Sequence, residues 1–390
     1  MARDHRRLAQ DAGKKLIVVA TPGRLLDHLE NTAGVAAMVR EVQTFVLDEF
    51  DTLLDMGFRP DITKIVSYLP VRERRQTMLF SATLPSSVLS IAHSLLKPDF
   101  ATVCCVTGAS DSGQPVLNLD IDQSYLSCSL SAMFPLLMAV IREHTAKVAD
   151  HKIIVFFSTA RITQWAATLF NLARLPVLEI HSRKSQAYVF PFFFLSIKSM
   201  QNSLSFLLFS SRNRTKVSDQ FRAQNKLIMF SSDVSARGMD YPGVSMVVQV
   251  GTPTNTEQYI HRIGRTARAG LTGEATLILA DFEADNFLKR DGKGLPLHPR
   301  ALPQQPLIDA ASRLVASTAP MLDYELGTVS YQSFLGFYGS ISAFKRDKAG
   351  LVALANLFAR DSMHLRQQPA LLKRTVGKMG LTGTSGLLTC

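Results

Sequence analysis

Short apolar runs alternate with helix-like patterns through the first hundred residues. Three runs, at residues 16–20, 45–47 and 78–80, are short and rich in residues that favour strands, which is typical of a buried sheet. Leucines at helical spacing follow the first two runs, and residues 88–96 form an apolar helical pattern that ends before Pro98. Strands that alternate with helices in this way indicate βαβ units and a parallel sheet.

A second series of the same kind follows. The pattern predicts strands at residues 152–157, 177–180, 226–230, 245–250 and 274–278, and helices at residues 133–144, 162–172, 216–221 and 256–263. A stretch rich in glycine, serine and aspartate at residues 108–113 separates the two series and is typical of a linker. We therefore expect one α/β domain over residues 1–107, a linker over residues 108–124 and a second α/β domain over residues 125–291.

The periodicity changes after residue 291. A proline-rich segment at residues 295–306 interrupts it, and helical spacing of apolar residues then returns at residues 308–315, 331–338 and 351–358. We expect residues 292–390 to form a helical C-terminal extension, with a frayed tail from residue 381 onward.

A phenylalanine-rich segment at residues 187–212 does not fit the alternation. Lys198, Gln201 and Asn202 interrupt it, so each apolar half is too short to cross about 30 Å of hydrocarbon, and no membrane partner is expected. The segment has neither polar periodicity nor helix-capping residues. It therefore resembles an insertion that arose from a gene-model error or from alternative splicing.

The composition is that of a globular protein with an excess of basic residues. Apolar residues make up 46% of the 390 positions and charged residues 19%, which suits two or three domains with packed cores. The 43 lysines and arginines exceed the 32 aspartates and glutamates, and the net charge of +11 favours a polyanionic partner such as nucleic acid. The four cysteines form no C-x-x-C pair, so neither a zinc site nor a disulfide framework is supported. We expect no cleavable targeting segment and a reducing compartment inside the cell, with nucleus, nucleolus, cytoplasm and mitochondrion left open.

Candidate chemistry first appears after the apolar run at residues 45–47, where the chain reads Asp48-Glu49-Phe50-Asp51. Ligands of α/β proteins bind beyond the carboxyl ends of the strands, so these acids are placed to serve a nucleotide and its metal ion. Asp48 would hold the metal, usually through water, and Glu49 would orient or deprotonate the attacking water. Taken alone, the string is equally compatible with a solvated acidic turn.

Residues 261–268 read His-Arg-Ile-Gly-Arg-Thr-Ala-Arg and concentrate positive charge. Three arginines at this spacing repel one another unless anions neutralise them, which favours a phosphate site over a solvated basic helix. We expect Arg265 and Arg268 to act as arginine fingers on a transferred phosphoryl group. We expect His261 and Arg262 to link the two domains.

Two weaker motifs stand in the first domain. Thr21-Pro22-Gly23-Arg24 opens a helix, where backbone N–H groups and Arg24 could bind an RNA phosphate. Ser81-Ala82-Thr83 follows a strand. Each string alone is compatible with ordinary helix capping. It is the arrival of four motifs in sequence, at α/β spacing, that favours a functional interpretation.

Together these strings resemble the motifs of the DEAD-box RNA helicases of superfamily two, over roughly residues 1–290. The resemblance includes Ser232-Asp233-Val234-Ser235-Ala236-Arg237-Gly238-Met239-Asp240. It implies two RecA-like parallel-sheet domains, the first one truncated, with ATP and Mg²⁺ as cofactors and RNA as the partner. The string from Tyr331 to Tyr338 resembles the helical C-terminal region found in the organellar and nucleolar branch of this family.

The resemblance also implies a role for each matching residue. The residues that would carry catalysis are Glu49, Arg265 and Arg268, with Asp48 at the metal ion. The residues that would bind ATP are Asp240, which would hold the ribose, Arg265 and Arg268. Those that would contact the RNA backbone are Thr21, Arg24, Thr159, Gln186, Arg214, Ser232 and Arg237. Those that would couple hydrolysis to strand separation are Ser81, Thr83, Asp51, His261 and Arg262.

The chain departs from the family pattern in three places. It contains no G-x-x-x-x-G-K-[ST] phosphate loop and begins just upstream of Thr21, so the first half of domain one is expected to be missing. The insertion separates Gln186 from its probable partner Arg214, and Phe50 replaces the usual alanine. We expect an ATP-dependent RNA helicase as an incomplete chain, and a non-catalytic RNA-binding or interaction protein remains the alternative. A translocase acting on DNA is disfavoured by the combination of motifs.

Overall fold

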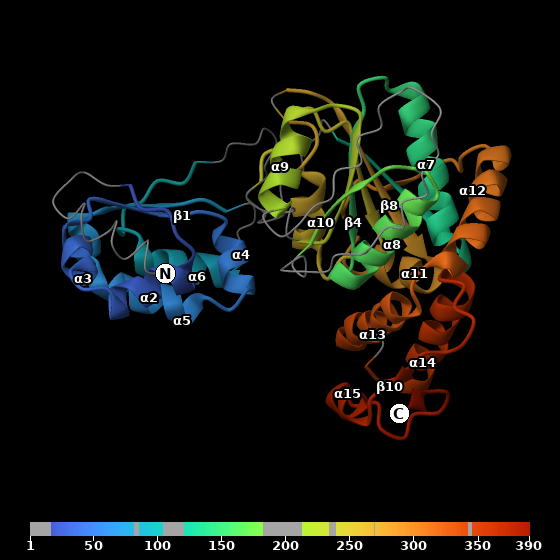
Figure 1. Cartoon of the computed structure of the whole chain (residues 1–390). Helices are drawn as coiled ribbons and strands as arrows, with labels where there is room; N and C mark the ends of the chain where they lie inside the picture. Colours follow the sequence, from blue (N-terminus) through green and yellow to red (C-terminus); the bar gives the residue numbers. More distant parts are fainter. Residues whose placement is uncertain are drawn as a thin grey trace, which may run out of the picture. The chain divides into compact units, whose positions relative to one another are not determined.

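The structure, a computed structural model, describes residues 17–81, 86–103, 121–181, 213–233, 239–268, 270–341 and 345–390. The chain divides into two compact units, residues 1–117 and 118–390, and each is described by itself (Figure 1). The boundary falls within the segment predicted as a linker. The predicted insertion at residues 187–212 lies outside the described residues. In the part of the chain that the structure describes, no helix has both the length and the apolar character needed to cross a membrane.

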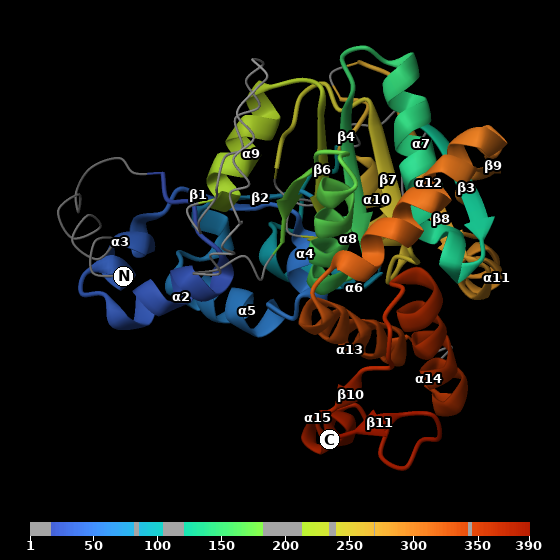
Figure 2. The same cartoon turned by 45° about the vertical axis from the view of Figure 1, so that its right-hand side comes forward.

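Unit 1 contains a pair of parallel strands with helices packed on it. Strands β1 (Thr44–Leu47) and β2 (Gln76–Leu79) pair from Thr44 with Gln76 to Leu47 with Leu79. The helices are α2 (Pro22–Asn31), α3 (Val35–Met38), α4 (Phe50–Asp55), α5 (Arg59–Tyr68) and α6 (Ser86–Leu95). Helices α2 and α5 pack together on one side of the strands (Figures 1 and 2). The strands predicted at residues 45–47 and 78–80 and the helix predicted at residues 88–96 are confirmed.

The strand predicted at residues 16–20 is wrong for the four residues that the structure describes. Residues 17–20 have no regular secondary structure, and the side chains of Ile17 and Val19 are 95% and 92% exposed. Preference of β-branched residues for strands depends on packing against neighbouring strands. Among the described residues, this run has no strand beside it.

Unit 2 is built on a parallel sheet of seven strands in the order β5-β6-β4-β7-β8-β3-β9. The strands are β3 (Ile121–Cys128), β4 (Lys152–Phe157), β5 (Leu178–Ile180), β6 (Leu227–Ser231), β7 (Met246–Val250), β8 (Gly273–Ala280) and β9 (His298–Pro299). Alternate residues of β4 belong to two different cores. One core contains Ile153, Val155 and Phe157, and the other contains Ile154 and Phe156. A sheet that is buried on both faces requires the continuous apolar strands that the sequence shows.

Helices cover both faces of this sheet (Figure 2). Those of the α/β part are α7 (Met133–Lys147), α8 (Ala160–Leu172), α9 (Asn213–Ala223), α10 (Thr256–Ile263) and α11 (Asp281–Lys289). Helices α7 and α8 contribute to one core, and Val217 and Phe221 of α9 contribute to the other. The helices and strands predicted for this region are confirmed, with ends that shift by a few residues. Strand β3 and helix α11 were not predicted.

The C-terminal extension is helical, as predicted, and packs as part of unit 2. Its helices are α12 (Gln305–Thr318), α13 (Tyr324–Ser340), α14 (Lys348–Leu357) and α15 (Lys373–Lys378). Helix α12 packs on α7 and helix α13 on α8. Buried residues of α12, α13 and α14, including Val315, Phe334 and Val352, complete the core that lies over α7 and α8.

The frayed tail predicted from residue 381 onward is wrong. The side chain of Leu381 is only 3% exposed. Strand β11 (Leu388–Thr389) pairs with β10 (Ala370–Leu371), and the N–H of Cys390 donates to the carbonyl oxygen of Leu371 at 3.0 Å. The end of the chain is held because its backbone finds hydrogen-bond partners and its leucine reaches the core.

Candidate nucleotide and RNA sites

The acidic string of unit 1 forms the turn that joins β1 to α4. Asp48 is exposed, and one of its carboxylate oxygens accepts a hydrogen bond of 3.0 Å from the N–H of Glu49. Glu49 has φ 48° and ψ 50°, in the left-handed region that few non-glycine residues adopt. Backbone strain of this kind persists only when the surrounding structure enforces it, and it gathers at functional sites.

Phe50 holds the turn in place through its packing in the core and through a backbone hydrogen bond. Its ring is fully buried in the small core formed with Leu47, Ile62 and neighbouring apolar residues. Its N–H donates to the carbonyl oxygen of Phe80 at 2.9 Å, which ties the turn to the end of β2. The phenylalanine that replaces the usual alanine therefore packs in the core beside the acidic turn, and it leaves Asp48 exposed and Glu49 half-buried.

Ser81 lies beside this turn. Its hydroxyl oxygen accepts a hydrogen bond of 3.3 Å from the N–H of Asp51, and the carboxylate of Asp51 accepts one of 2.9 Å from the N–H of Thr52. Asp51 is 3% exposed. The structure thus brings Ser81 and the acidic string together. Thr83 lies outside the described residues.

Thr21 and Arg24 lie at the start of α2, and the residues that precede them, 17–20, form no strand. Thr21 is exposed, its backbone is extended, and its carbonyl oxygen accepts the first helical hydrogen bond from Leu25 at 2.9 Å. Pro22 occupies the first turn, where its missing N–H costs nothing. The geometry is that of an ordinary helix start, with the Thr21 hydroxyl exposed and the Arg24 side chain half-buried.

In unit 2 the arginine string begins with a fully buried side chain. Arg262 is 1% exposed, and its guanidinium donates to Asp233 at 2.8 and 2.9 Å and to Gln249 at 3.3 Å. Gln258 also donates to Asp233, at 2.9 Å. Asp233, Gln249 and Gln258 were not assigned roles from the sequence. Asp233 could have been noticed because it stands inside the matched string, whereas Gln249 lies in an apolar strand.

The two predicted arginine fingers lie beside the predicted ribose ligand. Arg265 is 8% exposed and donates to the carbonyl oxygens of Met239 at 2.5 Å and His261 at 3.3 Å. Arg268 forms an ion pair of 2.6 Å with Asp240, with the two side chains 32% and 74% exposed. The structure therefore gathers Asp240, Arg265 and Arg268. It also shows that protein groups neutralise part of the arginine charge that the sequence assigned to a bound anion.

The predicted RNA contacts of unit 2 lie at the carboxyl ends of its strands. Thr159 follows β4 and caps helix α8, where its hydroxyl accepts a hydrogen bond of 3.2 Å from the N–H of Ile162. Ser232 follows β6, is 6% exposed, and donates its N–H to Ile180 at 3.3 Å. This edge is where ligands bind in open α/β sheets. Gln186 and Arg237 lie outside the described residues, and so does the side chain of Arg214.

A magnesium ion is compatible with the acidic turn. Over the described residues, no group of three or more histidine, cysteine, aspartate or glutamate side chains could hold a metal ion by itself. Mg²⁺ in phosphate-transferring sites keeps several waters and takes only one or two protein carboxylates beside the phosphates. The single exposed carboxylate of Asp48 suits that mode of binding.

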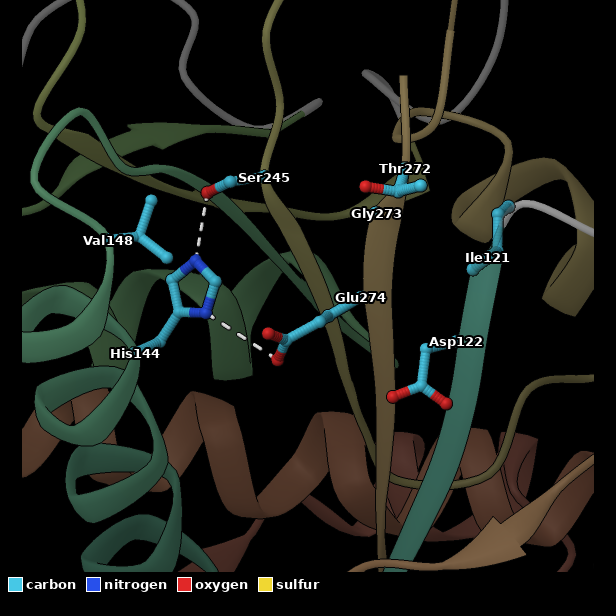
Figure 3. Close-up of a pocket in the computed structure, with 8 residues that line it drawn as sticks. All are labelled: Ile121, Asp122, His144, Val148, Ser245, Thr272, Gly273 and Glu274. Atoms are coloured by element: carbon cyan, nitrogen blue, oxygen red, sulfur yellow. Dashed lines mark hydrogen bonds and ion pairs between the residues drawn. The ribbon is translucent and has the colours of Figure 1, made fainter. Parts of the chain in front are cut away.

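A cavity lies at the opposite edge of the sheet of unit 2 (Figure 3). It has a volume of about 720 Å³ and is lined by residues at the starts of β3 and β8, by a residue that precedes β7 and by the C-terminal end of α7. His144 lies there between the hydroxyl of Ser245 at 2.9 Å and the carboxylate of Glu274 at 3.6 Å. Ser245 also bonds to both backbone groups of Lys152, at 3.1 and 3.2 Å. These bonds link the start of β4 to the residue that precedes β7. Ser245, His144 and Glu274 therefore have the composition of a catalytic triad, but the serine hydroxyl serves the structure of the sheet.

Comparison with known proteins agrees with this geometry. Residues 2–91 match the family model described as DEAD/DEAH box helicase, and residues 135–270 match the helicase conserved C-terminal domain. DEAD-box ATP-dependent RNA helicase 26 of Arabidopsis thaliana is 43% identical over 96% of the chain and 40% of its own length. DEAD-box ATP-dependent RNA helicase 31 of Oryza sativa subsp. japonica is 41% identical over 95% of the chain and 61% of its own length. The chain belongs to the DEAD-box helicase family.

Solved structures support the same fold. A structure of Mss116p bound to single-stranded RNA and AMP-PNP has a TM-score of 0.74 at 24% identity, covering 99% of the chain and 73% of that protein. Dbp5 of S. cerevisiae bound to RNA and ADP BeF3 has a TM-score of 0.57 at 24% identity, covering 77% of the chain and 70% of that protein. The chain thus spans two fifths of one of these curated relatives and about three fifths of the other, and it shares the two-domain RecA-like fold of the solved helicases.

Proposed function

We propose that this chain belongs to an ATP-dependent RNA helicase that hydrolyses ATP and unwinds RNA duplexes. The observation that carries the proposal is the gathering of Asp240, Arg265 and Arg268 in a DEAD-box chain whose other unit presents Asp48 and Glu49 on a strained turn. The names of the curated relatives support it, since they are ATP-dependent RNA helicases. A non-catalytic RNA-binding protein, the alternative, has no observation that favours it.

Each residue has a chemical task in the proposed reaction. Asp48 would hold Mg²⁺, which when bound would offset the charge of the phosphates. Glu49 orients the attacking water and accepts its proton. Arg265 and Arg268 stabilise the charge that develops on the transferred phosphoryl group. Arg265 reaches the phosphate only by exchanging the carbonyl oxygen of Met239 for it, so its present hydrogen bonds describe a resting position.

RNA is bound through its backbone at the carboxyl edge of unit 2. Thr159 and Ser232 stand there at neighbouring strand ends, and the net charge of +11 favours a polyanion. Contacts to the phosphate backbone carry no information on base sequence. We therefore expect binding to be insensitive to sequence and sensitive to salt.

The test is RNA binding by purified residues 1–390 at different salt concentrations. If about five phosphates are neutralised, raising the salt concentration fourfold weakens single-strand binding about 100-fold. The variant Arg313→Ala controls for the loss of one positive charge as such, because Arg313 is exposed on α12 and carries no proposed role in RNA binding. Binding that does not change with salt contradicts the proposed backbone contacts.

A further inference from the structure

The side chain of Glu283 is buried where the C-terminal extension meets the α/β part of unit 2. Glu283 lies in the first turn of α11, directly after β8, and is only 1% exposed. One carboxylate oxygen accepts hydrogen bonds from the N–H of Thr252 and from the hydroxyl of Tyr338, both at 2.6 Å. The other oxygen accepts the N–H of Ala280 at 2.8 Å. Tyr338 belongs to helix α13 and Thr252 to the loop after β7, so the carboxylate joins the extension to the segment that leads into α10.

The hydroxyl of Tyr338 supplies one of the three hydrogen bonds that this carboxylate receives. Burial of a carboxylate is costly unless hydrogen bonds replace the water that it loses. Burial raises the pKa of the Glu283 carboxyl, and the hydrogen bonds from Tyr338, Thr252 and Ala280 oppose that rise. Without the Tyr338 hydroxyl, the carboxylate would keep two donors in a site that excludes water. An opening of the loop at Thr252, which lets water in, would then become easier.

Further hydrogen bonds connect this loop with the arginine string. Two residues after Thr252, the N–H of Thr254 donates to the side-chain oxygen of Gln258 at 2.7 Å. The side-chain nitrogen of Gln258 donates to Asp233 at 2.9 Å, and the guanidinium of Arg262 donates to the same carboxylate at 2.8 and 2.9 Å. Gln258 and Arg262 lie one turn apart in α10. The extension is thus connected, through a short loop, to the helix that leads into the remaining arginines of the string.

The position of α10 decides where the arginine fingers lie. Arg265 follows this helix and donates to the carbonyl oxygen of His261 in its last turn, at 3.3 Å, so a shift of the helix moves the guanidinium with it. A misplacement of about 1 Å can cost about 10²-fold in rate. We propose that the C-terminal extension positions the arginine string for ATP hydrolysis through the contact between Tyr338 and Glu283. Both are positioning residues that act through α10. This inference rests on the proposed function, because it takes Arg265 to act on the transferred phosphoryl group.

The first measurement is amide hydrogen exchange in residues 1–390, followed on peptides by mass spectrometry. Tyr338→Phe removes the hydroxyl and keeps the ring. The matched control is Tyr331→Phe, because Tyr331 lies in the same helix, is fully buried and donates its hydroxyl to Asn356 of α14 at 2.8 Å, within the extension. A hydrogen bond to a charged group changes an equilibrium constant about 10- to 150-fold. Relative to strand β4, we expect the amides of residues 252–263 to exchange at least about 10-fold faster in Tyr338→Phe and at the wild-type rate in Tyr331→Phe.

The second measurement is RNA-stimulated ATP turnover, in a longer polypeptide in which a family segment with the phosphate loop precedes residue 1. Tyr338→Phe should lower kcat about 10- to 100-fold, because it misplaces the arginines. The KM for ATP should stay unchanged, since the arginines act on the transition state. Tyr331→Phe should keep the wild-type kcat. Fluorescence of the buried Trp165 in urea verifies that each variant is folded under the conditions of the assay.

A double-mutant cycle tests whether Tyr338 acts through Glu283. Glu283→Gln keeps the shape of the side chain but has one acceptor oxygen, whereas the three donors use two. It should therefore lower kcat in the same range as Tyr338→Phe. Because both replacements break the same contact, the double variant should be no slower than the slower single variant.

The failure of this inference is distinguishable from the failure of the proposed function. If Tyr338→Phe and Tyr331→Phe show the same exchange at residues 252–263 or the same kcat, the extension only stabilises unit 2 and the inference is overturned. The inference is also overturned if the effects of Tyr338→Phe and Glu283→Gln on kcat multiply in the double variant. If RNA does not stimulate turnover by the wild type, the proposed function fails, and the role given to the two positioning residues in hydrolysis fails with it.

Discussion

We expect the replacement of Arg262 to destabilise unit 2 much more than the replacement of Arg268, although both arginines belong to the string at residues 261–268. Arg262 is buried under the edge of the sheet, where it pairs with Asp233 and Gln249 and lies 5.5 Å from the centroid of the Phe156 ring. Arg268 pairs with Asp240 at the surface. We compare Arg262→Ala with Arg268→Ala.

The magnitudes follow from burial. Removing one partner of a buried ion pair costs about 3 to 5 kcal/mol, because the other charge is left unpaired. Asp233 is 40% exposed and can regain water, so the loss for Arg262→Ala should lie near the lower limit, at about 3 kcal/mol. An exposed pair such as that of Arg268 contributes about 0 to 1 kcal/mol.

Tryptophan fluorescence can measure the unfolding of unit 2 alone. Trp165 is the single tryptophan of the chain, lies in α8 and is fully buried, so its fluorescence reports the unfolding of unit 2 in urea. We expect the free energy of unfolding to fall by about 3 kcal/mol in Arg262→Ala and by less than about 1 kcal/mol in Arg268→Ala. Losses that agree within about 1 kcal/mol would refute the distinction between a structural and a functional arginine.

Two further variants test how unit 2 is built. Gly273→Ala should destabilise unit 2 by about 1 to 3 kcal/mol, since a Cβ there would collide with the side chain of Thr266. The control Gly336→Ala should not destabilise it, because a Cβ at that position makes only an ordinary contact. Equal urea midpoints for the two variants would contradict this. A hydrogen bond with His144, aided by the charges of His144 and Arg300, lowers the pKa of Glu274. A lowered pKa gives stability that is present above the ordinary pKa and is lost as the pH falls through the folded-state value. Glu274→Gln should therefore be less stable than the wild type at pH 7, with a difference that closes below about pH 4; a difference that does not change with pH would exclude the role given to the charge.

The sequence predicts the strands of unit 2 well where both faces are apolar, and fails where a buried strand is polar. Strand β3 was missed because Gln123 and Ser124 interrupt its apolar pattern, although each is only 2% exposed. Their side chains find partners on other elements, Tyr259 at 3.0 Å and Thr276 at 3.2 Å. Such pairing depends on residues about 140 to 150 positions away, which no local pattern reveals.

In the candidate site, too, the sequence reveals residues at local spacing but not partners that are distant in sequence. The acids and arginines were found because their spacing is local, and the structure brings Asp240, Arg265 and Arg268 together. One of the two partners of Arg262 was not found, because Gln249 stands in an apolar strand and gives no sign of its role. The bond between Thr159 and Ser333 joins residues 174 positions apart, so only the structure could connect them.

The most direct test of the central claim is RNA-stimulated release of phosphate from ATP. The assay requires a longer polypeptide in which a family segment with the G-x-x-x-x-G-K-[ST] loop precedes residue 1, because residues 1–390 contain no such loop and should show no turnover alone. In that polypeptide we expect RNA to stimulate turnover. Glu49→Gln should lower the rate about 10²- to 10⁴-fold while ATP still binds, since an amide keeps the shape of the carboxylate but cannot accept the proton. Near-normal turnover by Glu49→Gln would contradict the assignment of the acidic turn as the centre of ATP hydrolysis.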